Sequence, residues 1–419
     1  MINVNYLADN RVKYLPLFSV FIAMSLYCID VLLRVCPGVL SSQLITHYKI
    51  NQTAFSNLSA AYFYIYAPMQ LPVGILMDRY GPRKLLSVSS LACCLGTILF
   101  SLTHTYWIAF IGRLLIGFGA SFAFVGIMKL ATLVLPPNRF AVISGSTMAL
   151  GMIGAMVGDQ ILKHFLLNGQ WQGFMFKISG ILLILGLVIH LTAPTLNHND
   201  DEHSRYTMGQ IMRDALGLVR QREIWNAALI GCLMFTPLTW FAEYLGKTYL
   251  AMSMNISFSS ATNLNGLIFV GWAIGGLVVT SFSDYIRSRR LPIILGALVS
   301  FALSLLILYQ TGIRYEIMAL IMVVFGIANS VQVLAFPIAK EITKPHLQAT
   351  AMCFINMICM FSGNLQVFLG YSLDMVHHFS SHSHDVLQLS DYQIVFSLLP
   401  IALLLTSVIA YNMRESFSD

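Results

Sequence analysis

Charged residues are scarce in this sequence: Asp, Glu, Lys and Arg make up 10% of its 419 residues, whereas 57% are hydrophobic. A soluble globular protein carries about 25% charged residues, so the scarcity excludes an ordinary soluble domain. Segments of about ten residues with alternating hydrophobicity are also absent, which excludes a transmembrane β-barrel. The chain has instead apolar blocks of about twenty residues that contain Gly and Pro. These blocks predict an all-α membrane protein embedded in a lipid bilayer.

The sequence also lacks the motifs of an enzyme or a metalloprotein. It contains no GxSxG, no HExxH and no phosphate-binding glycine loop. Its seven cysteines show no CxxC spacing, and in apolar blocks cysteine acts as a small apolar residue. We therefore expect no catalytic activity, no cofactor and no bound metal. The polar stretches are too short for the output domain of a sensor, and the first apolar block is too long for a cleavable signal peptide.

Twelve apolar blocks are long enough to span a membrane. The first six are Leu15–Leu40, Phe55–Met77, Leu85–Leu102, Trp107–Leu135, Phe140–Leu162 and Phe174–Thr192. The second six are Ile224–Leu250, Ala261–Phe282, Leu291–Tyr309, Ile317–Ile342, Leu347–Leu373 and Tyr392–Tyr411. A polar linker over 194–223 separates an N-terminal bundle (1–193) from a C-terminal bundle (224–419). Repeated halves of this kind indicate a secondary transporter with its solute site between the halves, near the middle of the membrane.

The Lys and Arg residues are distributed unequally between the two sides of the predicted spans. With the N-terminus inside, sixteen of the 24 lie on the inner side, four on the outer side and four within spans. This bias places both termini in the cytoplasm, and we expect the chain to lie in a cell inner membrane. It also accounts for the net charge of +6 without a nucleic-acid partner.

Two motifs resemble those of the major facilitator superfamily. The segment GILMDRYGPRK, from Gly74 to Lys84, resembles the signature loop of that superfamily, and GRLLIGFG, from Gly112 to Gly119, resembles its second motif. The second half repeats the first motif in part, as SFSDYIRSRR. The resemblance implies two pseudo-symmetric six-helix bundles, transport by alternating access, and a gating charge network. That network would comprise Asp78, Arg79, Arg83, Arg113, Asp284 and Arg287.

A narrower resemblance concerns the solute. The runs YCIDVLLRVCPG and AFVGIMKLA are similar to those of phagosomal nutrient transporters of intracellular bacteria. Similar sequences serve as carriers of organic acids, amino acids, nucleosides and carboxylate siderophores. Span five lacks the Gly-Pro pair often found in antiporters of this superfamily and reads Gly145…Gly151…Gly154…Gly158-Asp159. Uptake is therefore favoured, and efflux is the rival hypothesis.

Among the charged residues of the predicted spans, we expect four cations and two anions, Asp30 and Glu243, to be clearly buried, and an ionisable group at the middle of the bilayer costs at least about 2.5 kcal/mol. Asp30 lies four residues before Arg34, and Glu243 lies four residues before Lys247, so each acid shares a helical face with a base. If both pairs form, Arg113 and Lys129 have no obvious acidic partner, and a net-positive interior suits an anionic solute. The planar fork of Arg34 suits bidentate binding of a carboxylate, unless Arg34 is permanently paired with Asp30.

Asp30 and Glu243 are the candidates for proton coupling. Burial favours the protonated form of a carboxyl group, whereas a nearby cation favours the ionised form. Solute binding that competes for Arg34 or Lys247 would therefore favour protonation.

Arg113 and Lys129 cannot both contact one small solute. They are sixteen residues apart, roughly 24 Å along a helix. We expect Arg113 to brace helix packing through backbone carbonyls, whereas Lys129 either contacts the solute or extends toward the cytoplasm.

Polar side chains within the spans complete the candidate site. Tyr62, Tyr66 and Gln70 form a stripe at four-residue spacing, which either lines a cavity or packs between helices. Asn329, Gln332, Asn356, Asn364 and Gln366 offer hydrogen-bonding groups in the second half, or join helices there. The full set of predicted solute contacts is Arg34, Tyr62, Tyr66, Gln70, Lys129, Glu243, Lys247, Gln332, Asn356 and Asn364.

Histidines gather after span eleven, at His377, His378, His382 and His384, followed by Asp385. A solvated loop is the simpler interpretation, and metal binding or pH sensing are the alternatives. Taken together, the sequence predicts a monomeric, proton-coupled symporter for a small organic anion or zwitterion, with the solute and protons as its partners.

Overall fold

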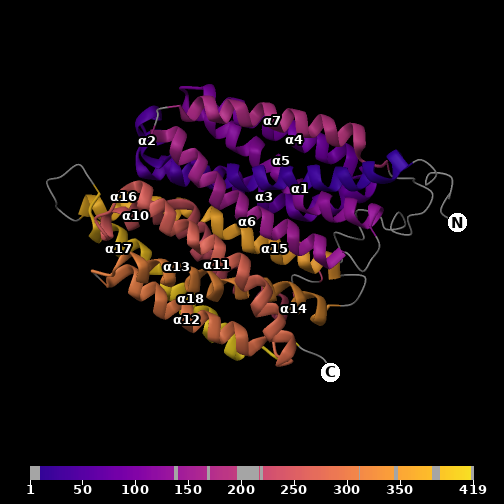
Figure 1. Cartoon of the computed structure of the whole chain (residues 1–419). Helices are drawn as coiled ribbons and strands as arrows, with labels where there is room; N and C mark the ends of the chain where they lie inside the picture. The colour runs from indigo at the N-terminus through magenta and orange to yellow at the C-terminus, as the bar shows by residue number, and fades with distance from the viewer. Residues whose placement is uncertain are drawn as a thin grey trace.

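The computed structural model describes residues 10–135, 140–167, 170–195, 217, 220–310, 312–343, 348–379 and 387–416, and these residues form helices without a strand (Figure 1). The first half contains six long helices and one short one. They are α1 (Asn10–Val39), α2 (Ser41–Tyr48), α3 (Gln52–Tyr80), α4 (Pro82–Leu102), α5 (Tyr106–Val134), α6 (Phe140–Leu167) and α7 (Trp171–Thr192).

The second half also makes six passes, but four of them are interrupted. The seventh pass comprises α9 (Arg222–Thr236), the π-helical segment η4 (Pro237–Leu245) and α10 (Gly246–Ser253). The eighth and ninth are α11 (Phe258–Tyr285) and α12 (Arg290–Tyr309). The tenth comprises α13 (Tyr315–Asn329), the 3₁₀ segment η5 (Ser330–Leu334) and α14 (Ala335–Ile342). The last two are α15 (Gln348–Asn364) with α16 (Gln366–Phe379), and α17 (Leu389–Phe396) with α18 (Leu398–Asn412).

Each predicted span corresponds to one of these passes, so the all-helical prediction is confirmed. Within the described ranges, ten segments are long and apolar enough to cross a membrane. The other two passes, α3 and α6, have 29 and 28 residues, about 42 Å of helix at 1.5 Å per residue. The predicted linker over 194–223 lies almost entirely outside the described residues.

The helices of the two halves lie in two groups, indigo to magenta and orange to yellow in Figure 1. The start of α1 and the end of α18 lie at one end of the molecule, which we call the terminal end. The opposite end, which we call the distal end, carries α2, α10 and α16. The halves meet where α3 packs against α15 and α16, where α6 packs against α11, and where α1 packs against η4.

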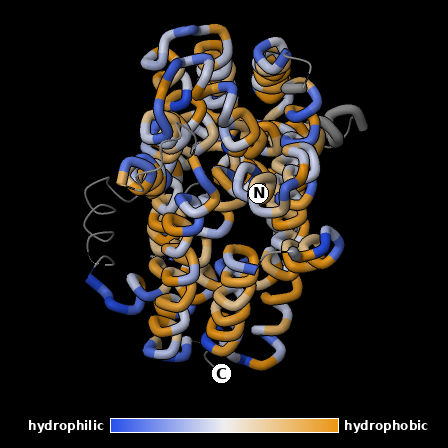
Figure 2. The backbone as a smooth tube through the Cα atoms, turned by 90° about the vertical axis from the view of Figure 1, so that its left-hand side faces the viewer, coloured by the Kyte–Doolittle hydropathy of each residue, from blue (hydrophilic) through white to orange (hydrophobic). Residues whose placement is uncertain are grey.

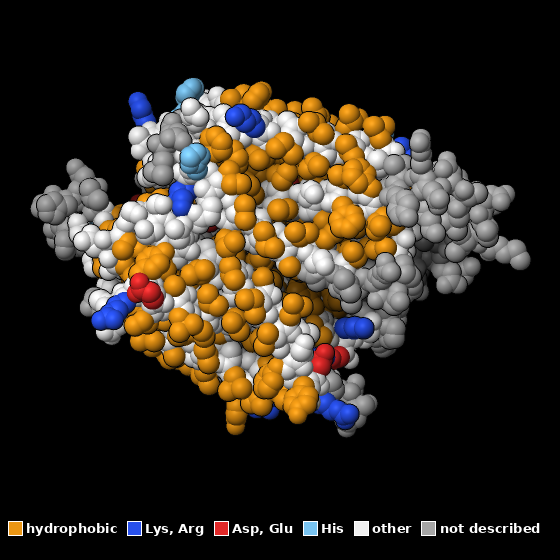
Figure 3. All heavy atoms as spheres, in the orientation of Figure 1, with side chains coloured by type: hydrophobic (Ala, Val, Ile, Leu, Met, Phe, Trp, Pro, Cys, Tyr) orange, Lys and Arg blue, Asp and Glu red, His pale blue; other side chains and the backbone are white. Residues whose placement is uncertain are grey.

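The surface matches a lipid environment. Hydrophobic residues predominate along the helices in Figure 2, and hydrophobic side chains cover the middle of the face in Figure 3, with charged side chains toward its ends. Leu277, Leu191 and Trp107 are among the large apolar side chains that are mostly exposed. Apolar surface of this extent is stable only against lipid tails.

The break in the seventh pass has a local cause. Pro237 lacks the amide hydrogen that would continue the α-helical ladder, and the chain widens into η4 from that residue. Asn265 of α11 donates a 2.8 Å hydrogen bond to the Ala242 carbonyl within η4. Gly38 of α1 lies directly against this segment, because a Cβ atom there would come within 2.2 Å of the Glu243 carbonyl oxygen.

Candidate functional site

Two buried ion pairs join the halves near the distal end. Arg34 of α1 lies 2.7 Å from Glu243 of η4, and Lys247 of α10 lies 2.7 Å from Asp159 of α6. The side chains of the first pair are 5% and 2% exposed, and those of the second are both 0% exposed. Each pair therefore connects a first-half residue to a second-half residue across a water-poor interface.

The pairing differs from the one expected within single helices. Arg34 pairs with Glu243 rather than with Asp30, and Lys247 pairs with Asp159 rather than with Glu243. Residues four apart do share a helical face, but in this protein that face is turned toward the opposite half. Asp159 was not counted among the buried anions in the sequence, although it follows the glycine-rich stretch of span five.

Counting Asp159 changes the charge of the interior. The buried cluster contains three cations, Arg34, Arg113 and Lys247, and three anions, Asp30, Asp159 and Glu243. Their formal charges cancel, so the expected excess of positive charge is absent from this cluster when every acid is ionised.

Asp30 differs from the other two acids. It is 2% exposed; the Cys93 thiol acts on its carboxylate as a weak hydrogen-bond donor, and no N–H or O–H donor within the described part of the chain lies within hydrogen-bond distance. Within the same residues it has no cation as an ion-pair partner. An ionised carboxylate in this position costs several kcal/mol, so Asp30 is the group for which protonation relieves the greatest penalty.

Arg113 braces three helices, as the sequence indicated. Its Nη1 donates to the Leu33 carbonyl at 2.6 Å and its Nη2 donates to the Ser59 carbonyl at 3.1 Å. The guanidinium carbon lies 5.4 Å from the centre of the Tyr62 ring. These neutral partners tie α5 to α1 and α3. A role for Arg113 in gating is not tested by these contacts.

Lys129 does not belong to the cluster. It is half-buried on α5, sixteen residues beyond Arg113 and roughly 24 Å along the helix. Because Arg113 contacts the backbone of α1 beside Arg34, the structure does not bring Lys129 and Arg34 to one site.

The predicted polar stripe faces the interface. Tyr62 and Tyr66 are buried and stack with ring centres 5.2 Å apart. Asn356 of α15 donates a 2.7 Å hydrogen bond from Nδ2 to Oε1 of Gln70. This contact joins the halves on the terminal side of the ion pairs.

The remaining second-half amides have different surroundings. Gln366 donates to the Thr239 carbonyl at 2.8 Å and accepts a hydrogen bond from Ser59 at 2.8 Å, so it joins helices as one of the alternatives proposed. Gln332 contacts the Cys359 sulfur at 3.4 Å. The Asn364 Oδ1 atom is buried and has no hydrogen-bond partner among the described residues.

Further contacts close the distal end. Gln52 of α3 donates to the Tyr244 hydroxyl at 3.0 Å. Asp374 of α16 accepts hydrogen bonds from the backbone amide of Thr53, at 2.8 Å, and from its hydroxyl. At the terminal end, α5 and α14 make no extensive contact within the described ranges. The structure is therefore closed at the distal end.

The charged residues at the terminal end form a network within the second half. Arg289 lies 2.5 Å from Asp284 and 2.8 Å from Glu341. Burial lowers the pKa of the Arg289 guanidinium, but its hydrogen bonds to Glu341 and Asp284 outweigh this effect and raise the pKa overall. Glu415 accepts a 2.8 Å hydrogen bond from the Arg289 amide. Arg287, which the sequence placed in the gating network, occupies a left-handed backbone position at φ 51°, and its gating role stays a prediction.

The first-half counterpart of this network is described only in part. The side chain of Asp78 lies outside the described residues. Arg79 is exposed and lies 5.5 Å from the centre of the Tyr80 ring, and Arg83 is half-buried at the start of α4. Among the described residues, no contact of Arg79 or Arg83 crosses between the halves, and their gating role stays a prediction.

The histidine group is also described in part. His377 lies 3.3 Å from Asp391, whereas His382, His384 and Asp385 lie outside the described residues. Within the described ranges, no group of three or more His, Cys, Asp or Glu side chains is placed to hold a metal ion.

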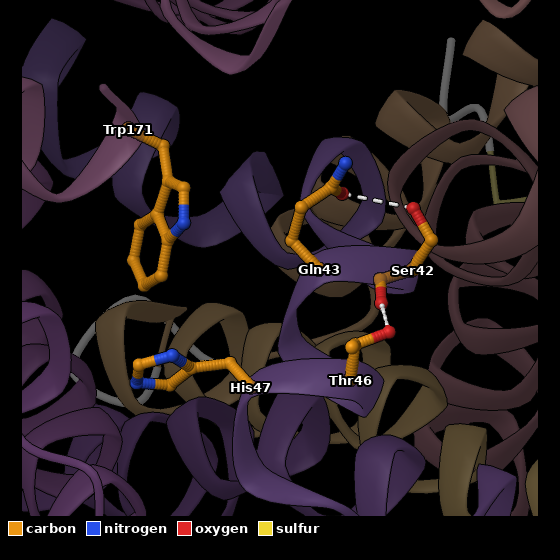
Figure 4. Close-up of a pocket in the computed structure, with 5 residues that line it drawn as sticks. All are labelled: Ser42, Gln43, Thr46, His47 and Trp171. Atoms are coloured by element: carbon orange, nitrogen blue, oxygen red, sulfur yellow. Dashed lines mark hydrogen bonds between the residues drawn. The ribbon is translucent and has the colours of Figure 1, made fainter. Parts of the chain in front are cut away.

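A shallow pocket opens on the distal surface (Figure 4). Ser42, Gln43, Thr46 and His47 of α2 line it, together with Trp171 at the start of α7. Gln43 accepts a 2.8 Å hydrogen bond from Ser42, and Thr46 donates to the Ser42 carbonyl at 2.9 Å. All five residues belong to the first half and none is Lys, Arg, Asp or Glu, so this pocket is separate from the ion-pair interface.

Curated relatives of the chain carry transporter names. It is 24% identical over 263 residues to a probable sulfoacetate transporter of Cupriavidus necator, which covers 58% of this chain and 60% of that protein. It is 18% identical to a probable galactarate/D-glucarate transporter of Escherichia coli, over 88% of this chain and 90% of that one. A probable L-galactonate transporter of Escherichia coli is 23% identical, over 88% and 86%.

Solved structures share the fold at low sequence identity. A bacterial homologue of the lysosomal transporter Spinster, in an inward-facing and occupied conformation, has a TM-score of 0.72 at 14% identity, over 94% of this chain and 96% of that one. The nucleoside transporter NupG has a TM-score of 0.71 at 14% identity, over 95% and 98%.

The sequence profile of the Major Facilitator Superfamily matches residues 19–366, which is most of the chain. Its members move small solutes across membranes and do not catalyse covalent reactions. The chain therefore belongs to the Major Facilitator Superfamily, and it is a multi-pass membrane transporter.

Proposed function

We propose that this transporter takes up a small organic anion together with protons by alternating access. One observation carries the proposal: Arg34 lies buried at the interface, and its carboxylate partner, Glu243, comes from the opposite half. A carboxylate or sulfonate on the solute presents the same oxygen atoms to the guanidinium as Glu243 does. An incoming anion can therefore replace Glu243 and keep the Arg34 charge paired, and the displaced Glu243 carboxylate must then take up a proton or pair with another cation.

The relatives support an acidic solute. Sulfoacetate, galactarate, D-glucarate and L-galactonate, which appear in their names, all carry a carboxylate, a sulfonate or both. The amides of Gln70, Asn356, Gln332 and Asn364 are suited to hydrogen-bond the polar part of such a solute. Organic acids, zwitterionic amino acids and carboxylate siderophores are the classes we consider for this site.

The charge balance supports coupling to protons. With all acids ionised the cluster is neutral, and an anion that enters it would leave one negative charge uncompensated. Protonation of Asp30, which has no cation partner among the described residues, gives the cluster one positive charge. The anion and the proton then bind together at lower cost than either binds alone, which is the energetic condition for symport.

The distribution of Lys and Arg supports the direction of opening. If the positive-inside rule holds, the terminal end faces the cytoplasm, and a structure closed at the distal end is inward-facing. Separation of the distal contacts would open the site to the outside. Because both halves of the site come from one chain, we propose that a monomer is sufficient.

Uptake into proteoliposomes tests the proposal. Purified protein is first screened by thermal shift with sulfoacetate, galactarate, D-glucarate, L-galactonate, amino acids, nucleosides and ferric carboxylate siderophores. Solutes that stabilise it are then tested for accumulation driven by an inward proton gradient. We expect an organic anion to accumulate, and we expect Asp30→Asn to abolish uphill uptake while solute exchange persists.

Two outcomes would contradict the proposal. Unchanged uphill uptake by both Asp30→Asn and Glu243→Gln would exclude these residues from proton coupling. Extrusion of the solute against its gradient, driven by proton entry, would favour the rival hypothesis of efflux.

A further inference from the structure

The two ion pairs cross the interface with opposite polarity. The first half supplies the cation Arg34 to one pair and the anion Asp159 to the other, whereas the second half supplies Glu243 and Lys247. Both second-half residues belong to the seventh pass and are four residues apart. One short stretch of the seventh pass therefore supplies the second-half partner of both ion pairs near the distal end.

The two pairs differ in how firmly they are held. Lys247 and Asp159 are completely buried, and Gly158 beside Asp159 packs so closely on Leu32 that an added Cβ would lie 2.5 Å from its side chain. Glu243 instead lies in the π-helical segment, and the Nε atom of Arg34 has no hydrogen-bond partner in the described part of the chain. The Arg34–Glu243 pair is thus the one held in an interrupted stretch of helix, and its guanidinium has a further N–H donor with which to bind an incoming anion.

Lys247 connects the pairs. It contacts Asp159 directly and also acts on the charge of Glu243. Glu243 therefore lies within the electrostatic reach of Arg34 and Lys247, while Asp159 competes for Lys247; Arg113 also acts on Glu243, but its guanidinium is bonded to backbone carbonyls. An anion that binds Arg34 must displace Glu243. The free-energy cost of this displacement is lower when Lys247 can pair with the displaced Glu243, and higher when Asp159 holds Lys247.

We infer that Asp159 is a positioning residue for solute exchange: by engaging Lys247 it keeps Glu243 on Arg34, and so sets the anion concentration needed to displace Glu243. The inference rests on the proposed anion site at Arg34. Asp159 itself touches no solute in this arrangement.

Although Asp159 and Lys247 form one ion pair, we expect their separate substitution to change the affinity for the anion in opposite directions. In Asp159→Asn, Lys247 loses its ion-pair partner and can pair with Glu243, so that Arg34 becomes available to the solute. The concentration of sulfoacetate or D-glucarate that gives half-maximal binding then falls about fivefold to tenfold, as expected for coupled charges in one network. Lys247→Gln removes the competing cation, holds Glu243 on Arg34, and raises that concentration by a similar factor. If both substitutions weaken binding, the pair is merely structural and the inference is wrong.

A double substitution keeps the test valid if a single one destabilises the protein. Asp159→Asn with Lys247→Gln leaves neither charge unpaired. Because Lys247 is then no longer present to receive Glu243, the double variant must bind the anion as weakly as Lys247→Gln alone. Binding like that of the unsubstituted protein would contradict the connection.

A second background separates displacement of Glu243 from a general electrostatic field. In Glu243→Gln there is no internal anion to displace, so adding Asp159→Asn must leave anion binding unchanged. If Asp159→Asn still raises the affinity for the anion about fivefold in the Glu243→Gln background, the Asp159 charge acts on the solute through space, and the inference is overturned.

A measurement without solute distinguishes failure of this inference from failure of the proposed function. Cys36 of α1 is buried and lies near Asp159 and Lys247. In a variant whose other six cysteines are replaced by serine or alanine, a membrane-impermeant maleimide added at the distal side reports opening at Cys36. We expect Asp159→Asn to accelerate labelling several-fold, because Lys247 is no longer held by α6.

Asp391→Asn is the matched control. Asp391 is equally buried, but it pairs with His377 and accepts a hydrogen bond from the Gln388 amide, and both residues belong to the second half. Its substitution should leave labelling and anion binding near their original values. If Asp159→Asn labels no faster than this control, Asp159 does not hold the interface, even if the transporter takes up organic acids. If no organic acid binds, the proposed function fails, and the labelling still decides whether Asp159 holds the interface.

Discussion

Two buried arginines in this protein are held by different kinds of partner. Arg113 donates to backbone carbonyls and lies over an aromatic ring, all neutral groups of the first half. Arg34 pairs with a carboxylate of the second half. A partner that belongs to the same bundle stabilises that bundle, whereas a partner across the interface must be released when the halves separate.

Conservative substitution should separate these two roles. Arg34→Lys keeps the charge but loses the planar fork that binds two oxygens at once. We expect the KM for the transported anion to rise about tenfold, which corresponds to about 1.4 kcal/mol, with little change in thermal stability. Uptake kinetics and thermal unfolding of the purified protein measure both quantities.

Arg113→Lys is the matched substitution. It removes donors to the Leu33 and Ser59 carbonyls, and an unsatisfied buried carbonyl costs about 1–3 kcal/mol. We expect a lower Tm and an unchanged KM in the protein that remains folded. The opposite pattern, a KM effect at Arg113 and only a stability effect at Arg34, would reverse the two assignments.

The sequence indicated which charges are buried but not how they pair. Apolar surroundings identify Asp30, Arg34, Glu243 and Lys247 as intramembrane charges, because each interrupts a block long enough to span the bilayer. Spacing along one helix reports only which side chains share a face. The partner depends on which helix approaches that face, so Asp159 was found only in the folded structure.

At the scale of elements, the first half has continuous long helices, whereas the second half has interrupted ones. Apolar block length predicted the passes, since a chain in lipid must satisfy its backbone hydrogen bonds internally. It did not predict the interruptions, because a π-helical segment is as apolar as the helix around it. Pro237 was the local signal for η4, and the stabilising contact from Asn265 lies on another helix.

The contact between Asn265 and the Ala242 carbonyl should matter for transport. Asn265→Ala removes the donor next to Glu243, and we expect a loss of about 1–3 kcal/mol of stability together with reduced uptake, because Glu243 is no longer fixed relative to Arg34. Thermal unfolding and uptake measure the two effects.

Asn329→Ala provides the comparison for this element. Asn329 is also buried and donates a 2.7 Å hydrogen bond to a carbonyl, but that carbonyl, of Phe325, belongs to its own helix. We expect a smaller loss of uptake than for Asn265→Ala. Equal losses would mean that η4 has no special dependence on its neighbour.

At the scale of the whole molecule, the contacts between the halves are unequal at the two ends. The distal side has both ion pairs, the Gln52–Tyr244 bond and the Thr53–Asp374 bonds. On the terminal side of the ion pairs, the described contacts include one amide–amide bond, Gln70–Asn356, and the packing of Leu71 on the second-half core. Among the described residues, opening toward the terminal end therefore breaks fewer polar contacts than opening toward the distal end.

Alternating access requires the distal contacts to break in each cycle, and a crosslink there should stop transport. In a background without native cysteines, Thr53→Cys with Asp374→Cys places one thiol on each half, where the native side chains are in contact. A short thiol-reactive bifunctional reagent should reduce uptake to under about a tenth, and a reductant that cleaves the linker should restore it.

His47→Cys with Thr103→Cys is the matched control, because these residues also touch at the distal end but both belong to the first half. Undiminished uptake with the Thr53–Asp374 crosslink in place would mean that the halves do not separate there, whereas inhibition in both pairs would show that the reagent, and not the closure, blocks transport.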